Sequence, residues 1–132
     1  RLGPRPDRDH GEEHWRWRLA VAEALAASLD PDHFGVKGLW LIGSTQHGLG
    51  GPEADIDLLV HVEGAEQEQR LRTWFDGWSR ALAEVNYLRT GHRSTGLLDV
   101  RFLSDPDVEN RTGLAAKIDA VTDAARPLRL GG

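Results

Sequence analysis

The chain has 132 residues, a net charge of −5 and 28% charged residues, a balance typical of one ordinary globular domain. It contains no cysteine, which excludes disulfides, thiol nucleophiles, zinc fingers and iron–sulfur sites. An acidic domain is a poor electrostatic match for a nucleic-acid backbone, and no apolar run approaches the roughly 18 residues of a membrane span. No signal peptide is visible either. We therefore expect a cytoplasmic domain without a membrane partner, and we regard nucleic acid as an unfavourable partner.

The first residues carry glycine and proline among charges, which indicates a flexible lead-in or linker over residues 1–11. The chain begins at Arg1 and contains no methionine, so we expect it to be either trimmed or cut from a longer polypeptide. Residues 12–125 are predicted to form a single domain, and residues 126–132 a frayed tail.

The first half of that domain predicts a helix, two strands and a turn between the strands. Apolar residues recur at three- and four-residue steps over residues 12–29, which is a helical pattern. The short apolar run at 36–42 is typical of a buried strand, and the glycine-rich stretch 44–54 is a turn region. Residues 55–62 alternate in the manner of a second strand.

The second half predicts a helix, a third strand and a last helix. An amphipathic stripe indicates a helix over 65–85, followed by a loop over 86–95. Residues 96–103 alternate as a strand, and 112–125 has a helical pattern. The element order predicts an α/β (α+β) fold, in which a small mixed sheet carries its helices mainly on one face.

Three aspartates stand out on the two predicted strands that carry acids. Asp55 and Asp57 are two residues apart, so both side chains emerge on one face, and Asp99 lies in an otherwise apolar strand. If these strands are neighbours, three carboxylates converge, and Arg101 can offset only one of them. Burying such charges unpaired is very costly, and a divalent cation would relieve the repulsion. Ligation by oxygen alone suits magnesium.

A glycine turn precedes these acids. Gly43-Ser44 follows the first strand directly, and ten residues separate Ser44 from Asp55. Backbone N–H groups at such a turn make a phosphate site, to which the serine hydroxyl adds a donor. The segment is not a Walker A loop, because no Lys-Ser or Lys-Thr pair follows Gly48.

Together these motifs resemble the polymerase-beta-type nucleotidyltransferases, in their minimal form. The pattern reads Gly43-Ser44, ten residues, Asp55-Ile-Asp57 in a strand, then Asp99 in a later strand. The resemblance covers roughly residues 36–103. It implies a mixed sheet flanked by helices, and transfer of a nucleoside monophosphate from a nucleoside triphosphate, most simply AMP from ATP.

The resemblance also implies roles for individual residues. Asp55 and Asp57 would hold magnesium, and Asp99 would hold the second of two ions, with manganese as an alternative metal, and help to activate an acceptor hydroxyl. Gly43 and Ser44 would cradle the β- and γ-phosphates. The acceptor could be a protein side chain, a small-molecule hydroxyl or an RNA end.

The chain departs from the family pattern in two respects. Ala54 stands where many members carry serine or threonine, and the second domain that binds the acceptor in larger members is absent from these 132 residues. Minimal members often work with a helical partner protein or as a fused domain. The segments 86–102 and 115–128 also resemble a nucleotidyltransferase-like module at the end of some pyruvate phosphate dikinase or phosphoenolpyruvate synthase-related chains.

Several other residues have both a functional and a structural interpretation. Arg93, together with Arg89 and His92, could contact the triphosphate or simply lie in a solvated loop. His47 and His61 could touch a nucleotide, although a structural role is the simpler interpretation. Trp74 and Trp78 share the apolar stripe of a helix, which favours core packing over base stacking. As a whole, the chain could also be a nucleotide-sensing or partner-binding module with little or no turnover.

Overall fold

The computed structural model describes residues 10–48 and 51–131, with the side chains of residues 10–13 and 44 left outside the description. Most of the predicted lead-in therefore lies outside the described residues. The elements in chain order are α1 (His10–Ser28), α2 (Pro31–Phe34), β1 (Val36–Ile42), α3 (Gly43–Gln46), β2 (Ile56–Val62), α4 (Ala65–Thr90), β3 (Leu98–Leu103), α5 (Asp105–Asn110), η2 (Gly113–Lys117) and β4 (Arg126–Pro127).

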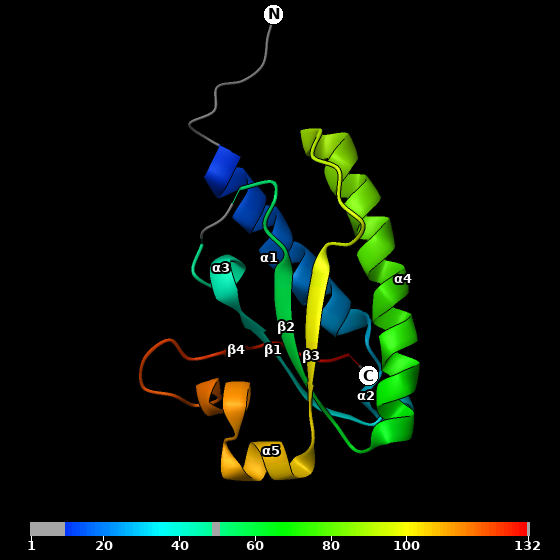
Figure 1. Ribbon diagram of the computed structural model, residues 1–132, viewed down its shortest axis with the longest axis vertical. Coiled ribbons are helices and arrows are strands. Elements are labelled where there is room, and N and C mark those ends of the chain that lie inside the picture. The colour runs from blue at the N-terminus through cyan, green and yellow to red at the C-terminus, as the bar shows by residue number, and fades with distance from the viewer. Residues whose placement is uncertain (1–9, 49–50, 132) are drawn as a thin grey trace, which may run out of the picture.

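The four strands form one mixed sheet in the order β3-β2-β1-β4 (Figure 1). β1 pairs with β2 and β4 in the antiparallel sense, whereas β2 and β3 are parallel and are joined by α4. The long α4 supplies the crossover that a parallel pair requires. As a result, the end of β1 and the beginnings of β2 and β3 meet at one end of the sheet.

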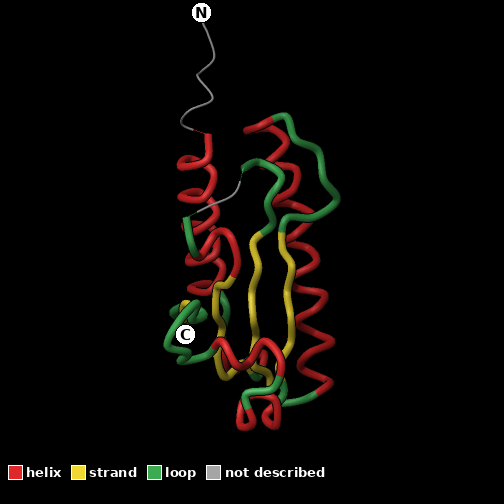
Figure 2. The backbone as a smooth tube through the Cα atoms, turned by 60° about the vertical axis from the view of Figure 1, so that its left-hand side comes forward, coloured by secondary structure: helices red, strands yellow, loops and turns green. Residues whose placement is uncertain are grey.

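One face of the sheet is covered by the two long helices. The even-numbered side chains of β2 enter the main core, together with apolar residues of α1 and α4. The other face is covered at its lower end by a smaller cluster from α5, η2 and the segment before β4. Figure 2 shows these short C-terminal helices gathered at one end of the strands. The expectation of helices mainly on one face is therefore confirmed, and the upper part of the opposite face is left to the aspartates.

Two expectations about helices were wrong. α4 continues to Thr90 instead of ending near residue 85, because Gly91 adopts a left-handed conformation (φ 80°) that closes the helix one turn later than expected. No helix spans 112–125: that segment holds the short η2 turn, and Asp119 and Asp123 have positive φ values of 60° and 52°. A residue in this conformation interrupts a right-handed helix.

The segment expected to be a frayed tail is instead built into the fold. β4 pairs with β1, the N–H of Leu128 donates to the carbonyl of Leu39 (2.8 Å), and the side chain of Leu128 is buried in the main core. Among the described residues, no helix combines the length and apolar character needed to cross a membrane.

The burial of Leu128 gives a stability test. Leu128→Ala removes a core side chain, and we expect it to lower the free energy of unfolding by about 2–4 kcal/mol. Arg129→Ala changes an exposed neighbour and serves as the control, with an expected change within about 0.5 kcal/mol. Chemical denaturation measures both. Equal, small effects of the two substitutions would contradict the packing of this segment.

Candidate active site

The three predicted aspartates come together at one end of the sheet. Asp57 and Asp99 are register partners on the parallel strands β2 and β3, so their side chains lie side by side on one face of the sheet. Asp55 lies directly before β2, where the N–H of Ile56 donates to the carbonyl of Leu97 (2.8 Å). Both Asp55 and Asp57 feel the negative charge of Asp99. The structure therefore places three carboxylates in mutual electrostatic contact, as the sequence predicted.

This convergence makes ionisation of the acids unfavourable. Burial raises the pKa of Asp57 to about 6, helped by the charges of Asp99 and Asp55, against the pull of Arg101. Burial also raises the pKa of Asp55, helped by Asp99 and opposed by Arg18 and His92. The site therefore holds more negative charge at neutral pH than its own cations offset.

Gly43 brings the glycine turn against these acids. It follows Ile42, the register partner of Asp57, and it has φ +79°. A Cβ atom at position 43 would lie 2.3 Å from Oδ2 of Asp57, a contact shorter than Cβ atoms make in real structures. Glycine is thus required both by the backbone conformation and by the close approach of the carboxylate. The backbone of Ser44 continues into α3, while its side chain lies outside the described residues.

The C-terminal segment holds α3 from one side. The side-chain amide of Gln46 donates to the carbonyl of Ala124, and Nε2 of His47 lies 2.5 Å from Oδ1 of Asp123. Lys117 pairs with the same carboxylate. Hydrogen bonds from Lys117 and then His47 lower the pKa of Asp123. His47 is therefore a structural contact between the glycine turn and residues 117–124.

Arg18 of α1 ties the two ends of the glycine loop together. Its side chain is fully buried; Nε donates to Oγ1 of Thr45 (3.1 Å) and an Nη donates to the carbonyl of Gly51 (2.9 Å). Burial lowers the pKa of this guanidinium, and the charges of Glu53 and Asp55 oppose that shift. One side chain thus connects α3 to the chain that leads into Asp55.

Asn86 of α4 holds the adjacent carbonyl. It is fully buried, and its amide donates to the carbonyl of Pro52 (3.0 Å). Two buried polar side chains, Arg18 and Asn86, therefore fix successive carbonyls just before Asp55. A buried polar group is tolerated when it is hydrogen-bonded, and it then specifies one arrangement of its partners.

The sequence analysis missed both of these positioning residues, although each carries a signal. Arg18 continues the buried stripe of α1, and Asn86 continues that of α4. A polar residue on the apolar stripe of a helix must find an internal partner. The sequence pattern also predicts a loop at Asn86, and this hides its place on the buried stripe of α4.

The other predicted candidates, Arg93 and Arg89, have partners other than the three carboxylates. Arg93 pairs with Glu84 (2.6 Å) and stacks over Tyr87, with its guanidinium carbon 3.7 Å from the ring centroid. Arg89 stacks over Trp17 at 4.4 Å. A phosphate-binding role of Arg93 therefore stays a prediction, one that requires the pair with Glu84 to open. His92, from the same loop, does act electrostatically on Asp55.

His61 and the predicted core tryptophans have structural contacts. His61 lies at the far end of β2, where Nε2 is 2.6 Å from Oδ1 of Asp105, a carboxylate also bonded to Lys37. Trp74 packs in an aromatic group with Phe34 and its neighbours in α4. The expectation of core packing was wrong for Trp78, which is 41% exposed and touches the aromatic group through Trp74.

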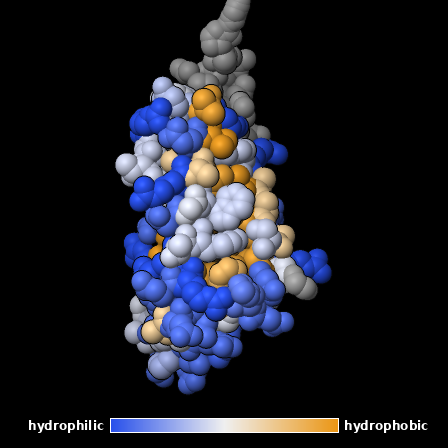
Figure 3. All heavy atoms as spheres, turned by 90° about the vertical axis from the view of Figure 1, so that its right-hand side faces the viewer, coloured by the Kyte–Doolittle hydropathy of each residue, from blue (hydrophilic) through white to orange (hydrophobic). Residues whose placement is uncertain are grey.

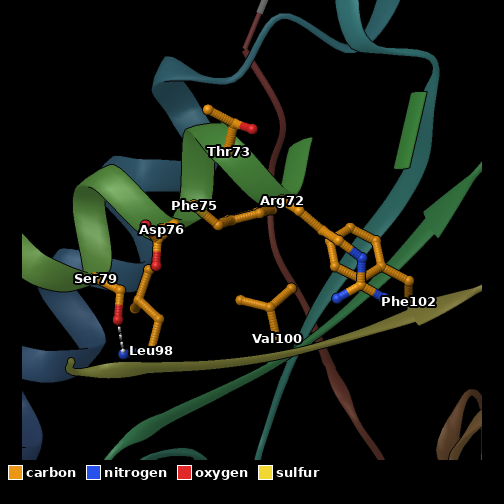
Figure 4. A pocket seen from close by; sticks show the side chains of 8 residues that line it. All are labelled: Arg72, Thr73, Phe75, Asp76, Ser79, Leu98, Val100 and Phe102. Atoms are coloured by element: carbon orange, nitrogen blue, oxygen red, sulfur yellow. Dashed lines mark hydrogen bonds between the residues drawn. The ribbon is translucent and has the colours of Figure 1, made fainter. Parts of the chain in front are cut away.

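A groove of about 430 Å³ lies on the opposite side of β3 from the acids. Its floor is formed by side chains of β3 that face α4, namely Leu98, Val100 and Phe102, and its other wall by α4 (Figure 4). Asp99 lies between these residues in the strand and points away from the groove, because successive side chains alternate. The groove is therefore separate from the carboxylate site.

Comparison with known proteins identifies the family. A family model described as a nucleotidyltransferase domain matches residues 27–128. The chain belongs to this nucleotidyltransferase family. No curated protein and no solved structure matches the chain.

The match confirms the resemblance to minimal polymerase-beta-type nucleotidyltransferases, and the mixed sheet agrees with it. The general activity of the family is transfer of a nucleoside monophosphate. The narrower likeness to a module of dikinase-related chains stays a prediction.

The carboxylates of this nucleotidyltransferase domain suit a divalent cation chemically. They supply oxygen ligands and an excess of negative charge, the features that magnesium favours. Within the described residues, no group of three or more His, Asp or Glu side chains is spaced to hold an ion directly. Asp57 and Asp99 are nonetheless close enough for the charge of Asp99 to raise the pKa of Asp57. Binding of a cation would therefore require a rearrangement of these side chains.

The raised pKa of Asp57 predicts an unusual dependence of stability on pH. An ordinary aspartate has a pKa of about 3.9, so the native state binds the proton of Asp57 more tightly than the unfolded state does. This contribution to stability is complete below about pH 4 and is lost as the pH rises through about 6.

In Asp57→Asn, residue 57 is uncharged at every pH, so ionisation at this position cannot lower the stability of the variant as the pH rises. Without divalent ions, we expect it to be more stable than the parent by about 1–2 kcal/mol at pH 8, a value discounted for solvent screening, and by little at pH 4. Thermal unfolding at both pH values measures the difference. Asp76→Asn, at an exposed ion pair with Arg80, should show no such trend. If Asp57→Asn were less stable than the parent at pH 8, ionisation of Asp57 would not be unfavourable in the native state, contrary to this prediction.

Proposed function

We propose that this domain is a magnesium-dependent nucleotidyltransferase that transfers a nucleoside monophosphate, AMP from ATP in the simplest case, to a hydroxyl acceptor. The observation that carries the proposal is the grouping of Asp55, Asp57 and Asp99 with the glycine turn pressed against Asp57. Family membership supports the general activity. The metal, the nucleotide and the roles below are our inference.

In this proposal, each residue of the site has a separate role. Asp55 and Asp57 hold the metal, and Asp99 completes the site on the acceptor side. The backbone at Gly43 and Ser44 binds the β- and γ-phosphates. Arg18 and Asn86 keep the loop before Asp55 in register with the turn. A small loss of alignment at such a site costs a large factor in rate, so these two side chains act as positioning residues.

The transfer itself is a displacement at phosphorus. The acceptor oxygen attacks the α-phosphorus, the bond from that phosphorus to the bridging oxygen breaks, and pyrophosphate leaves. Asp99 accepts the proton of the acceptor hydroxyl. Magnesium, when bound, would neutralise the negative charge that develops on the attacking and leaving oxygens. The nearby charge of Arg18 limits repulsion at Asp55.

Calorimetric titration with ATP, with and without magnesium, tests this proposal. We expect binding that requires magnesium and that weakens at least about tenfold, or about 1.4 kcal/mol, in Asp57→Asn. Asp76→Asn on the exposed face of α4 is the matched control and should bind like the parent. Titrations with GTP, CTP and UTP then give the base preference.

Two results would decide against the proposal. Equal ATP binding in the parent and in Asp57→Asn, or binding indifferent to magnesium, would mean that the carboxylates do not form the nucleotide site. Magnesium-dependent binding without release of pyrophosphate in the presence of any acceptor would instead favour a nucleotide-sensing module.

A further inference from the structure

The acid on β3 lies on an edge strand. β3 pairs with β2 on one side, and the described part of the chain provides no strand on the other (Figure 1). Asp99 is therefore different from Asp57, which lies on an interior strand. An edge strand offers unpaired backbone groups to another extended chain.

The hydrogen bonds of β3 show which of its backbone N–H and C=O groups are unpaired at the free edge. The carbonyl of Leu97 accepts from Ile56 of β2, whereas the N–H of Leu98 donates to Oγ of Ser79 on α4 (3.0 Å). Because backbone groups alternate in direction along a strand, those of Val100 and Phe102 also point away from β2. No hydrogen bond joins them to any other element in residues 10–48 and 51–131.

The groove between β3 and α4 lies beside this free edge. Its floor is apolar, with Phe75 of α4 facing the side chains of Leu98, Val100 and Phe102, and its rim carries Arg72 and Asp76 (Figure 4). Seen from the α4 side, pale and apolar side chains form a band between hydrophilic ones (Figure 3). A strand added to β3 would direct every second side chain into this groove.

We propose that the acceptor is the hydroxyl of a serine or threonine in an extended polypeptide segment that adds to β3 as an antiparallel strand. This inference rests on the proposed function. In this arrangement, the free edge of β3 binds the backbone of the acceptor segment. The groove holds the side chains on either side of the serine or threonine, and Asp99 contacts its hydroxyl.

The geometry of antiparallel pairing supports this assignment. The outward groups of Val100 would form the hydrogen-bonded pair, so the residue opposite Asp99 falls in a non-hydrogen-bonded pair. Such pairs have Cα atoms only about 4.5 Å apart, with their side chains close together. A short Ser or Thr side chain there reaches the carboxylate of Asp99, whose side chain is 43% exposed. The longer side chain of tyrosine would extend past it.

The transfer requires only ATP and the peptide as reactants. The serine oxygen bonds to the α-phosphorus of ATP, the bond to the bridging oxygen breaks, and pyrophosphate leaves with the electron pair. The hydroxyl proton passes to Asp99. The product is a phosphodiester that joins the serine or threonine oxygen to adenosine. The peptide sequence that this geometry requires is an apolar residue, then serine or threonine, then an apolar residue.

Binding is tested first, by NMR on the metal-free full chain. The probe is a six-residue peptide with valine at alternate positions and serine between, and its control carries N-methyl groups that block strand pairing. We expect amide exchange of Val100 and Phe102 to slow by at least about tenfold with the probe only. Exchange at Asp99 and Arg101, whose amides face β2, should not change.

Transfer is tested next, with magnesium, ATP labelled at the α-phosphate and the same peptide. We expect label on the serine peptide, none on its alanine form and much less on a tyrosine form. Thr73→Trp, which fills the groove, should reduce labelling, whereas Arg80→Ala on the exposed side of α4 should not. Unchanged ATP binding in both variants separates a groove effect from damage to the nucleotide site.

The outcomes distinguish this inference from the proposed function. Magnesium-dependent ATP binding with no protection of Val100 and no labelled peptide would overturn the inference alone. Protection of Val100 with label on neither serine nor threonine would overturn the acceptor assignment. Protection of the edge by a second copy of the chain, seen as a dimer in sedimentation, would also overturn it. Loss of ATP binding would overturn both proposals.

Discussion

The placement of Asp57 opposite Asp99 on adjacent parallel strands is the constraint on which the rest of the site depends. The two carboxylates repel each other when both are ionised, and Arg101, which pairs with Asp99 (3.3 Å), offsets only part of that charge. Their separation is set by the sheet, because the register of β2 and β3 is fixed by apolar side chains on the other face. The fold thus maintains an unfavourable charge arrangement that a bound cation would relieve.

The two long helices do more than cover the sheet. α1 contributes Arg18 and α4 contributes Asn86, and each buries a polar group in order to hold one carbonyl of the loop before Asp55. On the opposite side, residues 117–124 hold α3 through Gln46 and His47. Segments from both ends of the chain therefore fix the glycine turn, so a nucleotide site here would be preorganised.

Much of this arrangement could be predicted from local patterns. The alternation of β2 placed Asp55 and Asp57 on one face, and the apolar run around Asp99 required a partner for that acid. Adjacency of β2 and β3, by contrast, was only a condition of that argument, because no local pattern specifies which strands pair. Gly43 was recognised as a turn residue, but its contact with Asp57 depends on the pairing of β1 with β2.

The C-terminal part could not be predicted because long-range contacts override local propensity there. Residues 112–125 have helical composition, yet the N–H of Ala125 bonds to the carbonyl of Lys117 and β4 pairs with β1. The missed end of α4 was different, since Gly91 is a local signal for a helix end. Neither case affects the acids, whose strands were correctly placed.

A crystal structure grown with Mn²⁺ and a non-hydrolysable ATP analogue would test this account most directly. We expect anomalous density bounded by the carboxylates of Asp55, Asp57 and Asp99, and a triphosphate against the backbone of Gly43. Coordination of the metal should reorient the side chains of Asp57 and Asp99 toward it. Metal density elsewhere, with no metal in contact with Asp57 or Asp99, would contradict it.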